Sequence, residues 1–382
     1  MAITYNNLYL DIRARLRKEG CPGASLEARE LVCCGSGKTK EEFFRDAQLY
    51  VSPETEQAIM ALVERHLGGE PVAYLIGEWE FYGLPLDVSE AVLIPRPDTE
   101  VLCEEAIRYL KDLGPCRVLD LCAGSGCIGL AVAANVPESR VLLGDISEGA
   151  VRICRQNIRR NALTGQVTVM AMDALQPPPK AIGEFQCIVS NPPYIPRADI
   201  ETLDASVKDF EPYLALCGGE DGYDFYTSII RRWKDALVTG GRLYFEVGIG
   251  QADTVLRMMR AEGFGDLEIV HPIEDIPKDQ RQNIRVGSVV SGVFTLSGDA
   301  AIYEYEKGII LDEVHNLEIL RATFSGSDPE RLRYVLSEDA VYSAGYNSKQ
   351  YRGRDAIIER LKYVQDDTAE YFAYPAVITE VK

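Results

Sequence analysis

The chain has 382 residues, 46% of them hydrophobic, and 40 Lys and Arg against 59 Asp and Glu give it a formal net charge of -19. At roughly 150 residues per domain, this length predicts two or three folding units with buried cores and excludes wholesale disorder. Residues 1–90, 91–297 and 298–382 carry net charges of -6, -7 and -6, so no segment is basic. This distribution disfavours direct binding to nucleic acid and favours a basic protein partner or a small neutral ligand.

Membrane segments and paired cysteine motifs are both missing from the sequence. No apolar stretch approaches the roughly 18 residues that span a bilayer, so we expect a cytoplasmic protein without membrane contact. Ten cysteines lie between Cys21 and Cys217 without C-x-x-C spacing, and several stand inside apolar runs. This pattern favours reduced, buried thiols over disulfides and predicts no metal site.

Residues 1–73 predict a small helical bundle, because apolar positions recur there at helical spacing. The expected helices lie at residues 8–20, 25–36 and 53–69. Ser52 followed by Pro53 is a typical helix start. Over residues 74–94 the apolar period shortens and glycine turns appear, which predicts a β-hairpin linker.

In residues 95–297, short runs rich in β-branched and other apolar residues alternate with helical segments. This pattern indicates βαβ units and a mostly parallel sheet buried on both faces. The expected strands lie at residues 117–121, 140–145, 167–173, 185–190, 241–248 and 267–272. A further strand within residues 282–294 follows without a helical crossover, so a final hairpin is expected. In residues 298–382 a helix, a strand pair and another helix resemble a small nuclear-transport-factor-2-like α+β domain, which predicts a C-terminal extension.

A glycine-rich turn follows the first expected strand. Asp120 ends that strand, and Gly124, Gly126 and Gly129 lead into the helix. Such a turn lets backbone N–H groups approach a ligand at the carboxyl edge of a sheet, although it can also serve only to pack a helix on a strand. Its spacing departs from the dinucleotide fingerprint, and it lacks the Lys-Ser/Thr of a phosphate-binding loop.

Two acids end the next two expected strands. Asp145 is placed to accept the hydroxyls of a ribose, and Asp173 could meet an adenine amino group. For either acid alone, capping of the following turn is an equal alternative. Together they favour an adenosine ligand without a phosphate clamp, a description that S-adenosylmethionine fits better than NAD.

The segment Asn191-Pro192-Pro193-Tyr194 closes the fourth expected strand. Its prolines fix the backbone and end the strand, which a rigid turn without function would also explain. Asn191 Oδ1 and the Pro192 carbonyl can accept the two N–H groups of a planar nitrogen, while Tyr194 offers a flat apolar face. Methyl transfer from a sulfonium to such a nitrogen requires alignment more than a base, because the leaving group is a neutral thioether.

Over about residues 1–290 the chain resembles the release-factor glutamine methyltransferases. The resemblance rests on IPRPDTE, DLCAGSGC, SNPPYIP and FEPYLAL, of which IPRPDTE and NPPYIP together are the most specific. It implies a class I S-adenosylmethionine-dependent methyltransferase fold, with a mostly parallel Rossmann-like sheet, behind a helical domain that docks the substrate. It also implies methylation of the glutamine in the Gly-Gly-Gln motif of peptide chain release factors.

The resemblance assigns roles to individual residues. It places S-adenosylmethionine on Cys122, Ala123, Gly124, Ser125, Gly126, Asp145, Asp173, Ala174 and Asn191. It places the substrate glutamine on Asn191, Pro192, Pro193 and Tyr194, with Asn191, Pro192 and Tyr194 as the catalytic residues. Cys122 stands where the family commonly has glycine, and Ala174 where it commonly has an aromatic residue.

Five further charged residues are each open to two interpretations. Arg96, Asp98 and Glu100 either order the lid of the cofactor pocket or only start a helix. Glu211 and Glu246 are candidate polar pocket residues, although a Glu at a strand end is more often solvated.

Three other functions are compatible with parts of the sequence. One is a ribosomal-protein glutamine methyltransferase, whose acceptor is also a basic protein. Another is a DNA adenine-N6 methyltransferase, which shares Asn-Pro-Pro-Tyr but would need a cationic track for the strand. The third is a ligand pocket in the aromatic C-terminal extension, although core packing and oligomer contacts explain those aromatic residues more simply. The sequence leaves the oligomeric state open.

Overall fold

The computed structural model describes residues 3–21, 23–270, 288–294, 341–344 and 349–352. The chain divides into two compact units, Met1–Ala300 and Ala301–Lys382. In the second unit the described backbone is an antiparallel pair, β10 (Val341–Ala344) with β11 (Lys349–Arg352). The helices expected in the C-terminal extension lie outside the described residues.

The described N-terminal region is helical, as the apolar spacing predicts. Its helices are α1 (Tyr5–Lys18), α2 (Ala24–Ser36), α3 (Lys40–Arg45), α4 (Pro53–Leu67) and α5 (Val72–Ile76). Leu16, Leu31 and Ile59 are fully buried at the centre of one apolar cluster that these helices share. Ser52 caps α4 by accepting a hydrogen bond from the Thr55 amide, which confirms the predicted start of that helix. The short helices α3 and α5 are additions to the predicted set.

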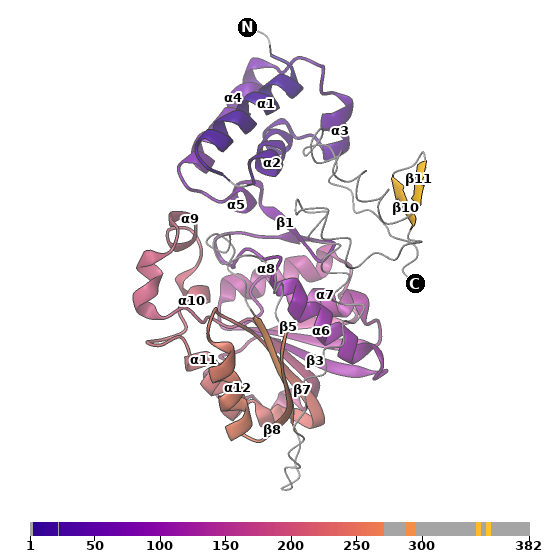
Figure 1. Ribbon diagram of the computed structural model, residues 1–382, viewed down its shortest axis with the longest axis vertical. Coiled ribbons are helices and arrows are strands. Elements are labelled where there is room, and N and C mark those ends of the chain that lie inside the picture. The colour runs from indigo at the N-terminus through magenta and orange to yellow at the C-terminus, as the bar shows by residue number, and fades with distance from the viewer. Residues whose placement is uncertain (1–2, 22, 271–287, 295–340, 345–348, 353–382) are drawn as a thin grey trace. The chain divides into compact units, whose positions relative to one another are not determined.

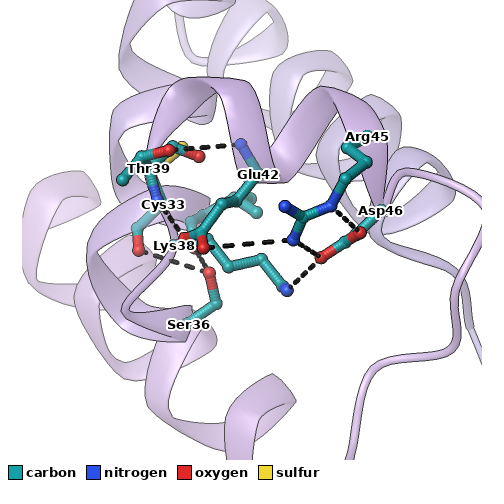
Figure 2. Close-up of polar contacts among 8 residues, drawn as sticks. Cys33, Ser36, Lys38, Thr39, Glu42, Arg45 and Asp46 are labelled. Atoms are coloured by element: carbon teal, nitrogen blue, oxygen red, sulfur yellow. Dashed lines mark hydrogen bonds and ion pairs between the residues drawn. The ribbon is translucent and has the colours of Figure 1, made fainter.

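A polar cluster fixes α3 and the residues on either side of it (Figure 2). The Thr39 hydroxyl accepts from the Glu42 amide while the Glu42 carboxylate accepts from the Thr39 amide, which completes a capping box. After the helix, the Asp46 carboxylate accepts from Lys38 Nζ and from Arg45 Nε, each at 2.8 Å. A helix of six residues is too short to be stable alone, so these caps contribute to its formation.

The predicted hairpin is present as β1 (Glu78–Phe81) paired with β2 (Leu84–Asp87). Tyr82 and Gly83 connect the strands, with φ angles of 51° and 74°. Two consecutive positive φ values are what a tight two-residue hairpin turn requires, because its twist then matches that of the strands.

The central sheet has seven described strands in the order β5-β4-β3-β6-β7-β9-β8 (Figure 1). Their bounds are β3 (Cys116–Leu121), β4 (Ser139–Asp145), β5 (Val167–Ala171), β6 (Phe185–Ser190), β7 (Leu237–Val247), β8 (Phe264–Val270) and β9 (Ser288–Phe294). All pairings from β5 to β7 are parallel, which confirms the mostly parallel sheet. The expected final hairpin is also confirmed, since β9 lies antiparallel to β8, and it inserts between β8 and β7.

Helices cover both faces of this sheet (Figure 1). One apolar cluster holds Val118 and Val189 with α6 (Thr99–Lys111), α7 (Cys127–Asn135) and α8 (Glu148–Arg160). The other holds Leu119 and Ile188 with α11 (Asp224–Arg232) and α12 (Ala252–Ala261). Neighbouring residues of one strand thus point to opposite faces, and both faces are buried, as continuous apolar runs predict. The short helices α9 (Ala205–Lys208) and α10 (Tyr213–Leu216) follow β6.

All ten cysteine side chains are free, and six of them are buried. Burial in apolar surroundings disfavours the thiolate, so these thiols are unreactive packing groups. No helix within the described residues is both long and apolar enough to cross a membrane.

Candidate active site

A cavity of about 1080 Å³, including the part that opens to solvent, lies at the carboxyl ends of β3, β4 and β6. Helix α7, which follows β3, and helix α11, which lies between β6 and β7 in the chain, cover opposite faces of the sheet, so a crevice opens between β3 and β6. Open α/β sheets bind ligands at such a switch point. Most predicted site residues line this cavity, namely Cys122, Ala123, Gly124, Ser125, Asp145, Asp173, Ala174, Asn191 and Pro193.

Three predicted site residues do not line the cavity. Gly126 precedes α7 at φ 83°, and a Cβ atom there would lie 2.9 Å from Leu143 Cδ1, so its role is to pack the helix on β4. Pro192 is buried. Tyr194 is half-buried, and its hydroxyl lies 3.5 Å from Glu246 Oε1.

The glycine-rich turn combines an open position with a strained one. Gly124 has φ 56° and no atom within 4 Å of its Cβ position, so a ligand can approach its backbone closely. Cys122 has φ 64°, a left-handed conformation that costs a side chain about 1 kcal/mol. The backbone conformation of this position therefore explains why the family commonly has glycine there.

Asp120 supports the turn from beneath. It is fully buried and accepts a hydrogen bond from the Gly129 amide at 2.8 Å. Burial, together with the nearby charge of Asp145, raises its pKa to about 7. Asp120 does not line the cavity, so its function is to hold the start of α7.

Asp145 and Asp173 each cap a turn at the edge of the cavity. Asp145 Oδ2 accepts from the Gly124 amide and its Oδ1 from the Ser147 amide, each at 2.8 Å. Burial nevertheless raises the pKa of Asp145. Asp173 Oδ1 accepts from the Leu175 amide at 2.8 Å. Both acids thus cap their own turns and also line the cavity.

A chain of hydrogen bonds orients Asn191. Its Nδ2 donates to Thr99 Oγ1 at 3.3 Å, and the Thr99 hydroxyl donates to Glu246 Oε2 at 2.6 Å. The Tyr194 hydroxyl approaches the other oxygen of Glu246. Only 4% of Glu246 is exposed, and this burial raises its pKa to about 7. The expectation that Glu246 is solvated is therefore wrong, because β7 runs through the centre of the sheet.

The segment IPRPDTE both starts a helix and contributes to the cavity wall. Helix α6 begins at Thr99, which confirms the helix-start interpretation. Arg96 lines the cavity and forms an ion pair with Glu211, whose side chain is 1% exposed, so Glu211 is not solvated either. Glu100 instead accepts from the Tyr82 amide of the hairpin at 2.9 Å. Asp98 is half-buried and does not line the cavity; burial raises its pKa.

The rest of the cavity wall is mostly apolar. Its larger apolar side chains include those of Ile146, Met172, Leu175, Leu214 and Phe225. Among the described lining residues, the charged ones are Asp145, Asp173 and Arg96, and Arg96 is paired with Glu211. The cavity therefore suits a ligand with a flat apolar part and a positive charge.

Comparisons with known proteins identify the family. Residues 7–77 match the PrmC N-terminal domain, and residues 104–209 match the methyltransferase small domain. The chain is 40% identical over 256 residues to the release factor glutamine methyltransferase of Geobacter sulfurreducens, an alignment that covers 66% of this chain and 87% of that protein. The chain belongs to the release factor glutamine methyltransferases.

Further members of the family align over a similar extent. The release factor glutamine methyltransferase of Thermodesulfovibrio yellowstonii is 37% identical over 66% of this chain and 90% of its own. That of Escherichia coli is 38% identical over 61% of this chain and 82% of its own. A solved release factor-specific protein-(glutamine-N5) methyltransferase from Alicyclobacillus acidocaldarius is 30% identical, covering 53% of this chain and 94% of that chain, with a TM-score of 0.30.

In this release factor glutamine methyltransferase, sequence reasoning missed Thr99 and undervalued Glu246. A signal for Glu246 was present, because it interrupts the apolar run YFEV in a strand predicted to be buried on both faces. An isolated carboxylate in such a strand needs hydrogen-bond partners. Thr99 carried no comparable signal, since it also fits an ordinary first turn of a helix.

Proposed function

We propose that this protein transfers a methyl group from S-adenosylmethionine to the side-chain amide nitrogen of the glutamine in the Gly-Gly-Gln motif of peptide chain release factors. Family membership supports the reaction class, and the orientation of Asn191 in the cavity wall carries the proposal. Asn191 Nδ2 donates a hydrogen bond to Thr99 Oγ1, so Asn191 Oδ1 remains to accept a hydrogen bond from an N–H of the substrate.

The cavity residues fit S-adenosylmethionine. The Asp145 carboxylate would accept hydrogen bonds from the ribose hydroxyls. The open backbone at Gly124 would allow the cofactor to approach it closely. Met172, Ala174 and Phe225 would contact the adenine, with Ala174 supplying packing without aromatic stacking. When bound, the cofactor supplies a methyl group on a positively charged sulfur.

The residues around Asn191 would align the acceptor amide. Asn191 Oδ1 would accept a hydrogen bond from one N–H of the substrate amide, which helps to turn its nitrogen toward the methyl group. Pro192 does not line the cavity, so we assign it the role of fixing the backbone that follows Asn191. Glu246 as a carboxylate accepts from Thr99 through one oxygen and faces the Tyr194 hydroxyl with the other. Because Tyr194 does not line the cavity, we assign it a positioning role.

We further propose that residues 1–73 dock the release factor, that residues 74–94 form the linker and that residues 95–297 carry the catalysis. The helical region has an apolar core of its own, which supports this division. Three exposed side chains, Phe44, Leu49 and Tyr50, together with the acidic charge, suit a basic protein partner.

The proposal is tested by incubating the protein with S-adenosylmethionine and release factor, followed by mass spectrometry. One methyl group is expected on the peptide that contains the Gly-Gly-Gln motif, and none when its glutamine is replaced by alanine. Ribosomal proteins and duplex oligonucleotide, assayed in parallel, test the ribosomal-protein and DNA alternatives. Equal labelling of the release factor and its alanine variant would contradict the proposal.

A further inference from the structure

A second cluster of reactive side chains lies in the helical N-terminal region, outside the cavity. Cys21, Glu27 and His66 each place one ligand atom within 4.8 Å of the other two. Cys21 follows α1, Glu27 lies in the first turn of α2, and His66 lies in the last turn of α4. Three separate elements thus converge on one point. The side chains are sheltered, with 12% of His66 and 24% of Glu27 exposed.

Hydrogen bonding fixes the orientation of the His66 ring. Its Nδ1 lies 2.9 Å from the Glu70 carbonyl oxygen, which can only accept, so Nδ1 carries a hydrogen. In the neutral ring, Nε2 therefore presents a lone pair. Nε2 lies 3.4 Å from Glu27 Oε2, and both atoms are buried. A protonated ring would make them an ion pair, whereas a neutral ring leaves two acceptors facing each other. Two acceptors in that position repel each other unless a cation lies between them.

We propose that Cys21, Glu27 and His66 bind a zinc ion. Sulfur, nitrogen and carboxylate oxygen are the donors that zinc prefers, and three protein ligands leave a fourth position for water. The Glu70 carbonyl would accept a hydrogen bond from His66 Nδ1 and so hold the ring with Nε2 toward the zinc ion. On binding, the Cys21 thiol gives its proton to solvent as the S–Zn bond forms, and the two negative ligands balance the ion.

The zinc ion would join the segment between α1 and α2 to the last turn of α4. This departs from the sequence-based expectation of no metal site, since no motif joins residues 45 positions apart. The alternative is a proton in place of the ion. A protonated His66 would then pair with Glu27, and Cys21 would take no part.

The test uses the full chain loaded with Co²⁺ in place of Zn²⁺. We expect one cobalt ion per chain and a thiolate-to-cobalt charge-transfer band in the near ultraviolet. Cys21→Ser should abolish this band, while Cys34→Ser, which changes an exposed cysteine of the same region, should leave it intact. Zinc content by atomic emission should fall from one per chain to near zero in Cys21→Ser.

Glu27→Gln and His66→Gln provide a second measurement in case Cys21→Ser does not fold. Each should weaken zinc binding by at least about tenfold in a competition titration with a chelator. Zinc should also raise the Tm of the unaltered chain and of Cys34→Ser, but not of these variants. Absence of stoichiometric metal would overturn the proposal in favour of the protonated pair. A charge-transfer band that persists in Cys21→Ser would overturn it by placing the metal on another cysteine.

Discussion

At the scale of single residues, the site depends on a hydrogen-bond network that orients Asn191. Asn191 is oriented by Thr99, which in turn is held by Glu246. A free amide can rotate to present either its oxygen or its nitrogen, and this chain selects the oxygen. Turnover should therefore depend on the whole network and not on Asn191 alone.

Replacement of Asn191 by alanine should lower kcat by about 10² to 10³, as removal of one aligned hydrogen-bonding group does in other enzymes. Affinity for S-adenosylmethionine should stay within about tenfold, because most of the cavity wall is unchanged. Single-turnover methyl transfer and calorimetric titration measure the two effects separately. Equal loss of binding and turnover would instead assign Asn191 to cofactor binding.

Replacement of Glu246 by glutamine should change the pH profile. The pKa of Glu246 is raised by burial to about 7, so the carboxylate that accepts from Thr99 forms as the pH rises through this value. We expect kcat to rise with an apparent pKa of about 7 in the unaltered enzyme and this limb to disappear in Glu246→Gln. KM for the cofactor should change little. An unaltered pH profile in the variant would refute a positioning role.

At the scale of elements, the Asn-Pro-Pro-Tyr segment is held by the residues that follow α10. Ile195 forms a parallel bridge with Cys217, and Gln251 Nε2 donates to the Tyr194 carbonyl at 3.0 Å. Gly218 packs directly on this segment, because a Cβ atom there would lie 2.6 Å from Tyr194 Cα. The rigidity that the prolines begin is thus completed by tertiary contacts.

Gly218→Ala should displace this segment, because the added methyl group meets backbone that cannot rotate away. We expect a loss of about 1–3 kcal/mol in the free energy of unfolding and a fall in kcat of more than tenfold. Gly165→Ala is the matched control, since no atom lies within 4 Å of its Cβ position. Urea unfolding and methyl-transfer assays of both variants test the expectation. Equal behaviour of the two would show that the segment tolerates displacement.

At the scale of the whole molecule, two buried acids link stability to pH. Burial raises the pKa of Asp120 from 3.8 and that of Glu246 from 4.5, both to about 7. The folded state therefore binds these protons more tightly than the unfolded state between pH 4 and 7. The stability that they contribute is present at low pH and is lost as the pH rises through 7.

Each of these acids should account for about 3–4 kcal/mol of that loss. Asp120→Asn and Glu246→Gln keep the size of the side chain but cannot ionise. Each should flatten the decline in unfolding free energy between about pH 4 and pH 7, measured by urea denaturation. Slopes identical to that of the unaltered protein would mean that neither acid is protonated in the folded state.

A chain that ends at residue 300 should retain methyl transfer. The family matches and the proposed site residues all precede this boundary between the compact units. A separate unit contributes little to the stability of its neighbour, so we expect kcat/KM within about threefold of the full chain. Loss of activity in a folded, truncated chain would instead give residues 301–382 a part in catalysis.

The sequence by itself determined the local structure and the family. Apolar periodicity specified the helices and strands, and IPRPDTE with Asn-Pro-Pro-Tyr pointed to the chemistry, because these signals depend on neighbouring residues. Only the tertiary structure decided that Glu211 and Glu246 are buried and that Tyr194 does not line the cavity. It also decided that the backbone of Cys122 adopts a left-handed conformation. Contacts such as Thr99 with Glu246, 147 positions apart, depend on the order of strands in the sheet, which no local pattern encodes.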